Sequence, residues 1–190
     1  EICMVPNHPQ KHEEGTRELK LTKELWIENE DFEINPPPKY FRLFPGNKVR
    51  LRYGFVIECT DYKLDDDGNV STVFCKYFPE TKSGTAGSDA VKVKGNIHWL
   101  STKFSKQVTI RNYDRLFLSE NPNEFDNFLD DINQSSIETN SAYCEESISD
   151  VQTGEQFQFE RHGYYIVDPD SNADEIIFNR TATLRDTWQK

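Results

Sequence analysis

Hydrophobic and polar residues alternate over many short stretches of this chain. In 157–160, two phenylalanines alternate with an amide and a carboxylate. A period of two puts alternate side chains on opposite faces of a β-strand, so this pattern predicts a strand with one buried face. Similar patterns predict strands at 18–22, 25–28, 48–60, 70–77, 90–100, 106–113, 137–145, 156–167 and 176–184.

Turn residues separate these strands. The run Asp-Asp-Asp-Gly-Asn at 65–69 predicts a hairpin turn, and Pro-Gly-Asn at 45–47 predicts another. One stretch, 123–132, has apolar residues at helical spacing and predicts one short helix. Many short strands with few helices favour a mainly β fold made of antiparallel β-barrels.

Composition supports a folded chain with an uneven charge distribution. The 190 residues include 13 Phe, 8 Tyr and 3 Trp, which is too much aromatic bulk for a disordered chain. The net charge of −11 argues against nonspecific binding to nucleic acid. Basic residues nevertheless gather at 39–52 and 92–115, so a basic face on an acidic body remains possible.

Apolar runs and cysteine spacing bear on the cellular context. No apolar run approaches the roughly 20 residues that a membrane span needs, so we expect no membrane association. The four cysteines are scattered without a Cys-x-x-Cys spacing, which favours reduced thiols and a cytoplasmic location. Because the chain opens with Glu1 rather than Met, we expect it to be part of a longer or processed protein.

Two basic clusters are candidate RNA contacts. In 48–53, strand alternation puts Lys48, Arg50 and Arg52 in one outward row, with a spacing close to that of successive phosphates. Lys39 and Arg42 flank two aromatic residues, a mixture that suits unstacked bases in single-stranded RNA. A solvated strand face and ordinary core aromatics are the alternative interpretations.

A third cluster consists of Gln158, Glu160 and Arg161. The amide can both donate to and accept from a base edge, and the carboxylate can orient the arginine. Strict alternation would put Arg161 on the phenylalanine face, so it requires a bulge or the end of the strand, which Gly163 could supply. A surface salt bridge is the alternative.

Catalytic and metal chemistry are not indicated. The histidines and cysteines lack the spacing of a zinc site, and the acidic run at 65–69 lacks the closing glutamate of a calcium loop. No nucleophile stands beside a plausible base, and no Gly-rich loop could hold a phosphate. We therefore expect no catalytic residues, no metal and no cofactor in these 190 residues.

Seven blocks in order resemble a known family. They are Val-Pro-Asn-His-Pro at 5–9, Val-Arg-Leu-Arg-Tyr at 49–53, Val-Lys-Val-Lys-Gly at 91–95, Ile-His-Trp-Leu-Ser at 97–101, Tyr-Asp-Arg-Leu-Phe at 113–117, Phe-Gln-Phe-Glu-Arg at 157–161 and Phe-Asn-Arg-Thr at 178–181. Together they resemble the C-terminal anticodon-binding region of bacterial-type glutaminyl-tRNA synthetases, over essentially the whole chain.

This resemblance implies two β-barrels, similar to a ribosomal protein that binds 5S RNA, which hold the anticodon loop of glutamine tRNA. It implies that Arg52 meets the first anticodon base, with Arg50 closer to phosphate. It places Gln158 and Arg161, oriented by Glu160, at the central uracil. Further contacts implied by position are Arg42 and Lys39 at the third base, a guanine, and Gln10 at the loop.

The resemblance also implies an activity for a parent enzyme. Family members are class I ligases that attach glutamine to tRNA using ATP, with Mg, in a catalytic domain that these residues do not contain. We expect a monomer with a first barrel at 25–104 and a second formed by 105–190 together with 1–24. The alternative is an acidic β-barrel module that binds a protein or carbohydrate partner; a standalone hydrolase is a remote third possibility.

Overall fold

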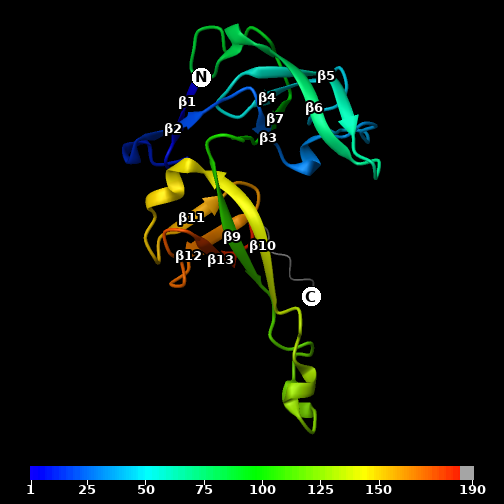
Figure 1. Cartoon of the computed structure of the whole chain (residues 1–190), viewed down its shortest axis with the longest axis vertical. Coiled ribbons are helices and arrows are strands. Elements are labelled where there is room, and N and C mark those ends of the chain that lie inside the picture. The colour runs from blue at the N-terminus through cyan, green and yellow to red at the C-terminus, as the bar shows by residue number, and fades with distance from the viewer. Residues whose placement is uncertain (185–190) are drawn as a thin grey trace. The chain divides into compact units, whose positions relative to one another are not determined.

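The computed structural model describes residues 1–184, which form two compact units (Figure 1). The first unit is Glu1–Phe104 and the second is Ser105–Lys190. Strands dominate both units, and the described residues contain short 3₁₀ turns but no α-helix. The chain is therefore mainly β, as the alternating pattern predicts. Residues 185–190, which the predicted second domain includes, lie outside the described residues.

The first unit contains three small sheets. Strands β1 (Ile2–Pro6) and β2 (Thr16–Lys20) pair antiparallel, as do β3 (Leu25–Trp26) and β8 (Leu100–Ser101). The largest sheet has the order β6-β5-β4-β7, in which β4 and β7 run parallel. Its strands are β4 (Lys48–Leu51), β5 (Val56–Leu64), β6 (Val70–Phe78) and β7 (Gly95–Ile97). The 3₁₀ turns are His12–Glu14, Asn29–Asp31 and Pro79–Thr81.

One apolar core connects the sheets of the first unit. Val49 and Leu51 of β4 are buried on one face, while Lys48 and Arg50 occupy the other, half-buried face. Trp99 is among the largest fully buried side chains and packs in the same core. Burial of apolar area is the main stabilising contribution to such a unit. The core residues are Cys3, Val5, Leu19, Phe32, Leu43, Val49, Leu51, Ile57, Cys59, Ile97 and Trp99.

The second unit is built on one five-stranded sheet with the order β10-β9-β13-β12-β11. Its strands are β9 (Ser105–Tyr113), β10 (Ile137–Glu145), β11 (Gln156–Phe159), β12 (Gly163–Val167) and β13 (Ile177–Ala182). Short 3₁₀ turns lie at Pro122–Glu124, Phe128–Asp131 and Glu146–Asp150. The core residues are Val108, Ile110, Ile148, Tyr165, Val167, Ile176 and Phe178.

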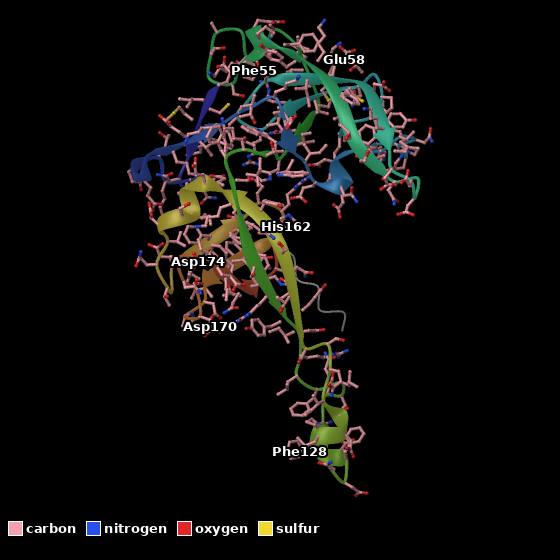
Figure 2. All side chains as sticks on the ribbon, in the orientation of Figure 1. Phe55, Glu58, Phe128, His162, Asp170 and Asp174 are labelled. Atoms are coloured by element: carbon pink, nitrogen blue, oxygen red, sulfur yellow. The ribbon has the colours of Figure 1, made fainter. Side chains whose placement is uncertain are left out.

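A long hairpin extends from this sheet. Strands β9 and β10 pair antiparallel along their whole length, from Ser105↔Glu145 to Ile137↔Tyr113, and the chain between them forms a separate tip (Figure 1). Phe128, labelled in Figure 2, lies at the tip and contacts Phe117 edge-to-face at a centroid distance of 6.3 Å. Five large apolar side chains of the tip are exposed: Leu116, Leu118, Phe125, Phe128 and Leu129.

The helix predicted at 123–132 is wrong. The chain there makes two separate 3₁₀ turns, Pro122–Glu124 and Phe128–Asp131, with extended backbone at Phe125 and Asn127 between them. The Asn127 side chain accepts a hydrogen bond from the Leu129 amide and thereby begins a new turn. Asparagine and aspartate bond readily to nearby backbone and disfavour a helix interior, so helical spacing of apolar residues was not sufficient.

The predicted strand positions are confirmed in outline, but their continuity is not. Hairpins interrupt two long segments: 48–60 divides into β4 and β5, and 156–167 divides into β11 and β12. The predicted strand at 90–100 begins only at Gly95 and divides into β7 and β8. The pairing is also not purely antiparallel, because β4–β7 and β13–β9 are parallel. Each large sheet has two end strands, so closure into barrels stays a prediction.

The domain boundaries differ from the compact units at the N-terminus. The sequence attaches 1–24 to the second domain, whereas Cys3, Val5 and Leu19 pack in the core of the first unit. Which residues fold as an independent domain remains a prediction. Within residues 1–184, no helix is long and apolar enough to cross a bilayer.

Candidate nucleic-acid interface

Arg52 lies in a tight turn directly after β4. The Gly54 amide donates to the Leu51 carbonyl at 2.7 Å, which closes a four-residue turn, and Tyr53 at its third position has a φ of 60°. The Arg52 guanidinium carbon lies 5.2 Å from the centre of the Tyr53 ring, and Nη2 donates to the Tyr53 hydroxyl at 3.3 Å. Arg52 is therefore presented by a turn and not by the predicted continuous strand.

The backbone of Arg52 is fixed from both sides. Its amide donates to the Ile97 carbonyl at 3.0 Å, and its carbonyl accepts from the indole Nε1 of Trp99 at 2.9 Å. Trp99 is buried, so this hydrogen bond is shielded from competing water. The turn that carries Arg52 is thus anchored to the core of the first unit.

Arg50 is half-buried and binds the chain's own backbone. Its Nη1 donates to the Thr81 carbonyl at 2.7 Å, to the Ser83 hydroxyl at 3.3 Å and to the Gly54 carbonyl at 3.4 Å. Its Nη2 donates to the Ser88 carbonyl. The segment 80–89 is therefore attached to β4 through this guanidinium.

Lys39 and Arg42 line one open hollow of about 510 Å³. Arg42 Nη1 donates to the Glu30 carbonyl at 3.0 Å and lies 3.4 Å from Oδ1 of Asp31, whose side chain is fully buried. The guanidinium is thus partly neutralised by its own chain, although a third of its side-chain surface remains accessible, at 34%. The residues that line the hollow are Glu30, Glu33, Pro37, Lys39, Tyr40, Phe41 and Arg42.

The segment that carries Arg42 lies directly against β7. A Cβ atom at Gly95 would overlap the Phe41 carbonyl and would come within 2.8 Å of Val49 Cγ1. Only glycine permits this close approach. Lys94, one residue earlier, places its ammonium 5.8 Å from the Phe41 ring centre and so adds a cation beside the hollow.

Gln158, Glu160 and Arg161 lie on the β11–β12 hairpin. Gln158 is exposed on β11, opposite Phe157 and Phe159, which pack against the core of the second unit. The His162 amide donates to the Phe159 carbonyl at 3.0 Å, so the strand ends before Arg161. Arg161 is exposed with a φ of 66° in this turn, and His162 beside it is labelled in Figure 2. The strand end that the sequence requires at Arg161 is confirmed.

The three candidate clusters share one backbone feature. Among residues 1–184, the non-glycine residues with positive φ are Lys39 (68°), Tyr53 (60°) and Arg161 (66°). Each is the third residue of a turn closed by a hydrogen bond to the first; for Lys39 this bond joins the Tyr40 amide to the Pro37 carbonyl at 3.3 Å. This position favours glycine or asparagine, and a bulky residue there costs about 1 kcal/mol or more. Such strain concentrates at functional sites.

Gln10 occupies a different element, the connection between β1 and β2. Its amide and that of Lys11 both donate to Nδ1 of His8, each at 3.1 Å. Its side chain is exposed. Arg50, Arg52, Lys39 and Arg42 belong with Gln10 to the first unit, whereas Gln158, Glu160 and Arg161 belong to the second unit.

Sequence reasoning missed three residues of these sites. Tyr53 was missed because a continuous strand was expected at 48–60; it lies in a turn, packs on the core and places its ring beside Arg52, and the Gly54 that follows it was the available signal for a turn. Trp99 donates to the Arg52 carbonyl, and the Lys94 ammonium lies beside the Phe41 ring. Each contact joins residues more than 40 positions apart, so no local sequence pattern indicates it.

Charged contacts stabilise the far end of β12. Asp168 is buried there and accepts from the Asp170 amide at 2.8 Å, from the Asn179 side chain, and from Arg111 Nη1 at 3.2 Å. These donors lower the pKa of the Asp168 carboxyl below its usual range, the Asp170 amide contributing most. Within residues 1–184, no three His, Cys, Asp or Glu side chains are grouped to hold a metal ion.

Two family models match this chain, both described as anticodon-binding domains of class I tRNA synthetases for E and Q. One matches residues 1–78 and the other residues 96–168. Between them they cover most of the chain, including every candidate cluster. The chain belongs to this family of class I tRNA synthetase anticodon-binding domains.

Curated relatives narrow the type of synthetase. Over its full length the chain is 54% identical to the glutamine–tRNA ligase of Cupriavidus metallidurans, 51% to that of Ralstonia nicotianae and 50% to that of Rhodopirellula baltica. The chain spans about a third of these relatives: 33% of the first two and 32% of the third. It is therefore similar to the anticodon-binding portion of glutamine–tRNA ligases.

Proposed function

We propose that this chain is the anticodon-recognition region of a glutamine–tRNA ligase and that it binds the anticodon loop of glutamine tRNA. Its similarity to glutamine–tRNA ligases over the whole chain supports this proposal. The observation that carries it is that the three left-handed turns fall at the three clusters of candidate base contacts. Backbone strain is retained where a side chain must be presented in a defined direction.

Each cluster has a proposed role. Arg52, with Arg50 beside it, would serve the first anticodon base, and Arg42 with Lys39 would serve the third. Gln158 and Arg161, oriented by Glu160, would hold the central uracil through the hydrogen-bonding edge of the base. Gln10 would contact the loop elsewhere. We further propose that the sheets of each unit roll into a barrel around these sites.

The remaining activity belongs to the complete ligase. Attachment of glutamine to tRNA, driven by ATP with Mg²⁺, would take place in parts of the protein outside these 190 residues. In the part proposed here, base recognition is noncovalent and requires no cofactor. A monomeric, cytoplasmic protein is the form we propose.

Aminoacylation by the ligase that contains these residues tests the proposal. Arg52→Ala should reduce the preference in kcat/KM for the native first anticodon base about tenfold, because a base contact is worth about 1–3 kcal/mol. Lys63→Ala is the control, since Lys63 is an exposed cation of the same unit that lies on β5, outside the candidate clusters. An unchanged base preference in Arg52→Ala would contradict the assignment.

The net charge of −11 favours a second candidate, an acidic module that binds a protein or carbohydrate partner. Gel mobility with an anticodon stem-loop distinguishes the two. Preference for the glutamine stem-loop over one with a changed central base supports RNA recognition. Equal retention of both stem-loops contradicts base recognition, and no retention of either by the ligase that contains these residues favours the acidic module.

A further inference from the structure

The guanidinium of Arg50 has acceptors from three separate points of the chain. It donates to the carbonyls of Thr81 and Ser88, to the Ser83 hydroxyl and to the Gly54 carbonyl. These acceptors are uncharged, and three of them belong to the segment 81–88. An arginine has five N–H donors, and a side chain that uses them on backbone carbonyls holds a loop in place.

The same loop also supports the turn that carries Arg52. The amide and the hydroxyl of Ser83 both donate to the Gly54 carbonyl, each at 2.9 Å. The Thr81 side chain is buried and accepts from the Val56 amide at 2.8 Å, which ties the loop to the start of β5. Phe55, labelled in Figure 2, connects the turn to β5. Loop, turn and strand therefore form one hydrogen-bonded unit around Gly54.

Tyr53 acts from the other side of this unit. Its φ of 60° places its ring beside the guanidinium of Arg52, at 5.2 Å, with the hydroxyl as an additional acceptor. The ring also packs against the core of the first unit, so its own position is defined. An aromatic face and a planar guanidinium stack favourably, which restricts the rotamers of the arginine.

We infer that Arg50 and Tyr53 are positioning residues that fix the side chain of Arg52, and that Arg52 alone of the three contacts the anticodon base. The part of this inference that concerns RNA contact rests on the proposed function. Arg50 acts through the 81–88 loop and the Gly54 carbonyl, and Tyr53 acts through ring stacking. The competing interpretation is that Arg50 binds an RNA phosphate directly.

The order of the 81–88 loop can be measured by hydrogen exchange on the 190-residue chain, without RNA. In Arg50→Lys, the Ser83 and Ser88 amides should exchange hydrogen about tenfold faster or more, because a lysine cannot reach the same set of carbonyls. Ser83→Ala is a milder second variant that removes one hydroxyl, in case Arg50→Lys folds poorly. Lys48→Ala controls for loss of a cation from the same face of β4, and its loop exchange should match the wild type.

The side chain of Arg52 supplies a second readout. Its Nε–H signal in ¹⁵N NMR should show an ordered side chain in the wild type and an averaged one in Tyr53→Asn. Asparagine tolerates a positive φ, so this variant removes the ring while keeping the turn. Tyr53→Phe removes only the hydroxyl and should leave most of the order. An Arg52 signal that is unchanged in both Tyr53→Asn and Arg50→Lys would overturn the inference.

Measurements of RNA binding distinguish a positioning role of Arg50 from a direct contact between Arg50 and an RNA phosphate. The probes are an anticodon stem-loop of glutamine tRNA and the same stem-loop with its first base changed. Arg50→Lys and Tyr53→Asn should each lower discrimination between them about tenfold, with the slope of log affinity against log salt unchanged. If Arg50→Lys binds as the wild type does while Arg50→Ala reduces that slope by about one, Arg50 contacts phosphate and the inference is wrong.

These measurements distinguish failure of the proposed function from failure of the positioning inference. If the wild-type chain discriminates neither stem-loop, the proposed function fails, while hydrogen exchange and the Arg52 signal still decide whether the positioning network exists. If the wild type discriminates and both variants keep full discrimination, the proposed function survives and the positioning roles of Arg50 and Tyr53 are refuted.

Discussion

The turns at 51–54 and 159–162 have the same backbone form but different surroundings. Tyr53 and Arg161 both adopt a positive φ at the third turn position. The first turn is anchored by the buried Trp99 and by the Ile97 carbonyl, whereas Arg161 and His162 are exposed at the end of a hairpin. The first strained turn is thus anchored by core packing and neutral hydrogen bonds, whereas the second lies at the exposed end of a strand pair.

The strand after the second turn adds a further contrast. β12 begins two residues after Arg161 and is followed directly by Asp168, which is stabilised by charged and polar donors including Arg111. The first turn is anchored by an indole, by backbone amides and by an arginine bound to carbonyls. The two regions should therefore respond differently to loss of core volume and to pH.

Removal of the indole should have the largest effect. We expect Trp99→Leu to lower the opening free energy of the β4 amides by about 3 kcal/mol, because it leaves a cavity and removes the donor to the Arg52 carbonyl. Native-state hydrogen exchange measures this. Trp26→Leu is the control, since Trp26 is 48% exposed and should cost less than about 1 kcal/mol. Similar losses of opening free energy in β4 and β12 of Trp99→Leu would contradict the contrast between the two regions.

Neutralisation of Asp168 should have a smaller, pH-dependent effect. Because the folded-state pKa of Asp168 is lowered, its contribution is present above the ordinary carboxyl pKa of about 3.9 and is lost as pH falls below it. We expect Asp168→Asn to weaken protection of the β12 amides by about 1–2 kcal/mol at pH 7, with the difference shrinking below about pH 4.

Exposed Asp170 provides the control for that substitution, since Asp170→Asn keeps the backbone amide that donates to Asp168. Its effect should be clearly smaller. A difference between wild type and Asp168→Asn that stays constant from pH 3 to pH 7 would be inconsistent with the depressed pKa.

Glycine in each turn should have the smallest effect, of opposite sign in the two. Arg161→Gly relieves a strained exposed residue and should raise protection of β11 and β12 by about 0.5–1 kcal/mol. Tyr53→Gly relieves similar strain but loses a ring packed on the core, so a net loss of about 1 kcal/mol is expected around β4. A change in protection of the same sign in both variants would mean that the two turns respond alike despite their different surroundings.

Local sequence patterns correctly predicted the elements whose structure is decided by residues close together in the chain. The 137–145 strand and the 65–69 hairpin turn are where the alternation and the Asp-Gly signal put them, because both are decided over a few residues. The helix at 123–132 failed for the opposite reason: the pattern was present, but Asn127 formed its own turn. The parallel pairing of β4 with β7 joins segments over 40 residues apart and leaves no local signal.

The candidate sites show the same limit. The residue types at 50, 52, 158 and 161 indicated hydrogen bonding to RNA, and the resemblance to a family assigned their roles. The direction of each side chain was not available from the sequence, because a strand was assumed where a turn occurs at Arg52. The loop acceptors of Arg50 lie 31 to 38 positions further along the chain, so its attachment to the 81–88 loop required coordinates.

The bare backbone at Gly95 limits how this domain can be redesigned. Since even a methyl group there would collide with the carbonyl that precedes Arg42, an alanine would displace the segment bearing the third-base candidates before any contact with RNA is altered. Libraries that aim to change codon assignment can vary the side chains around the hollow, but position 95 should stay fixed in them.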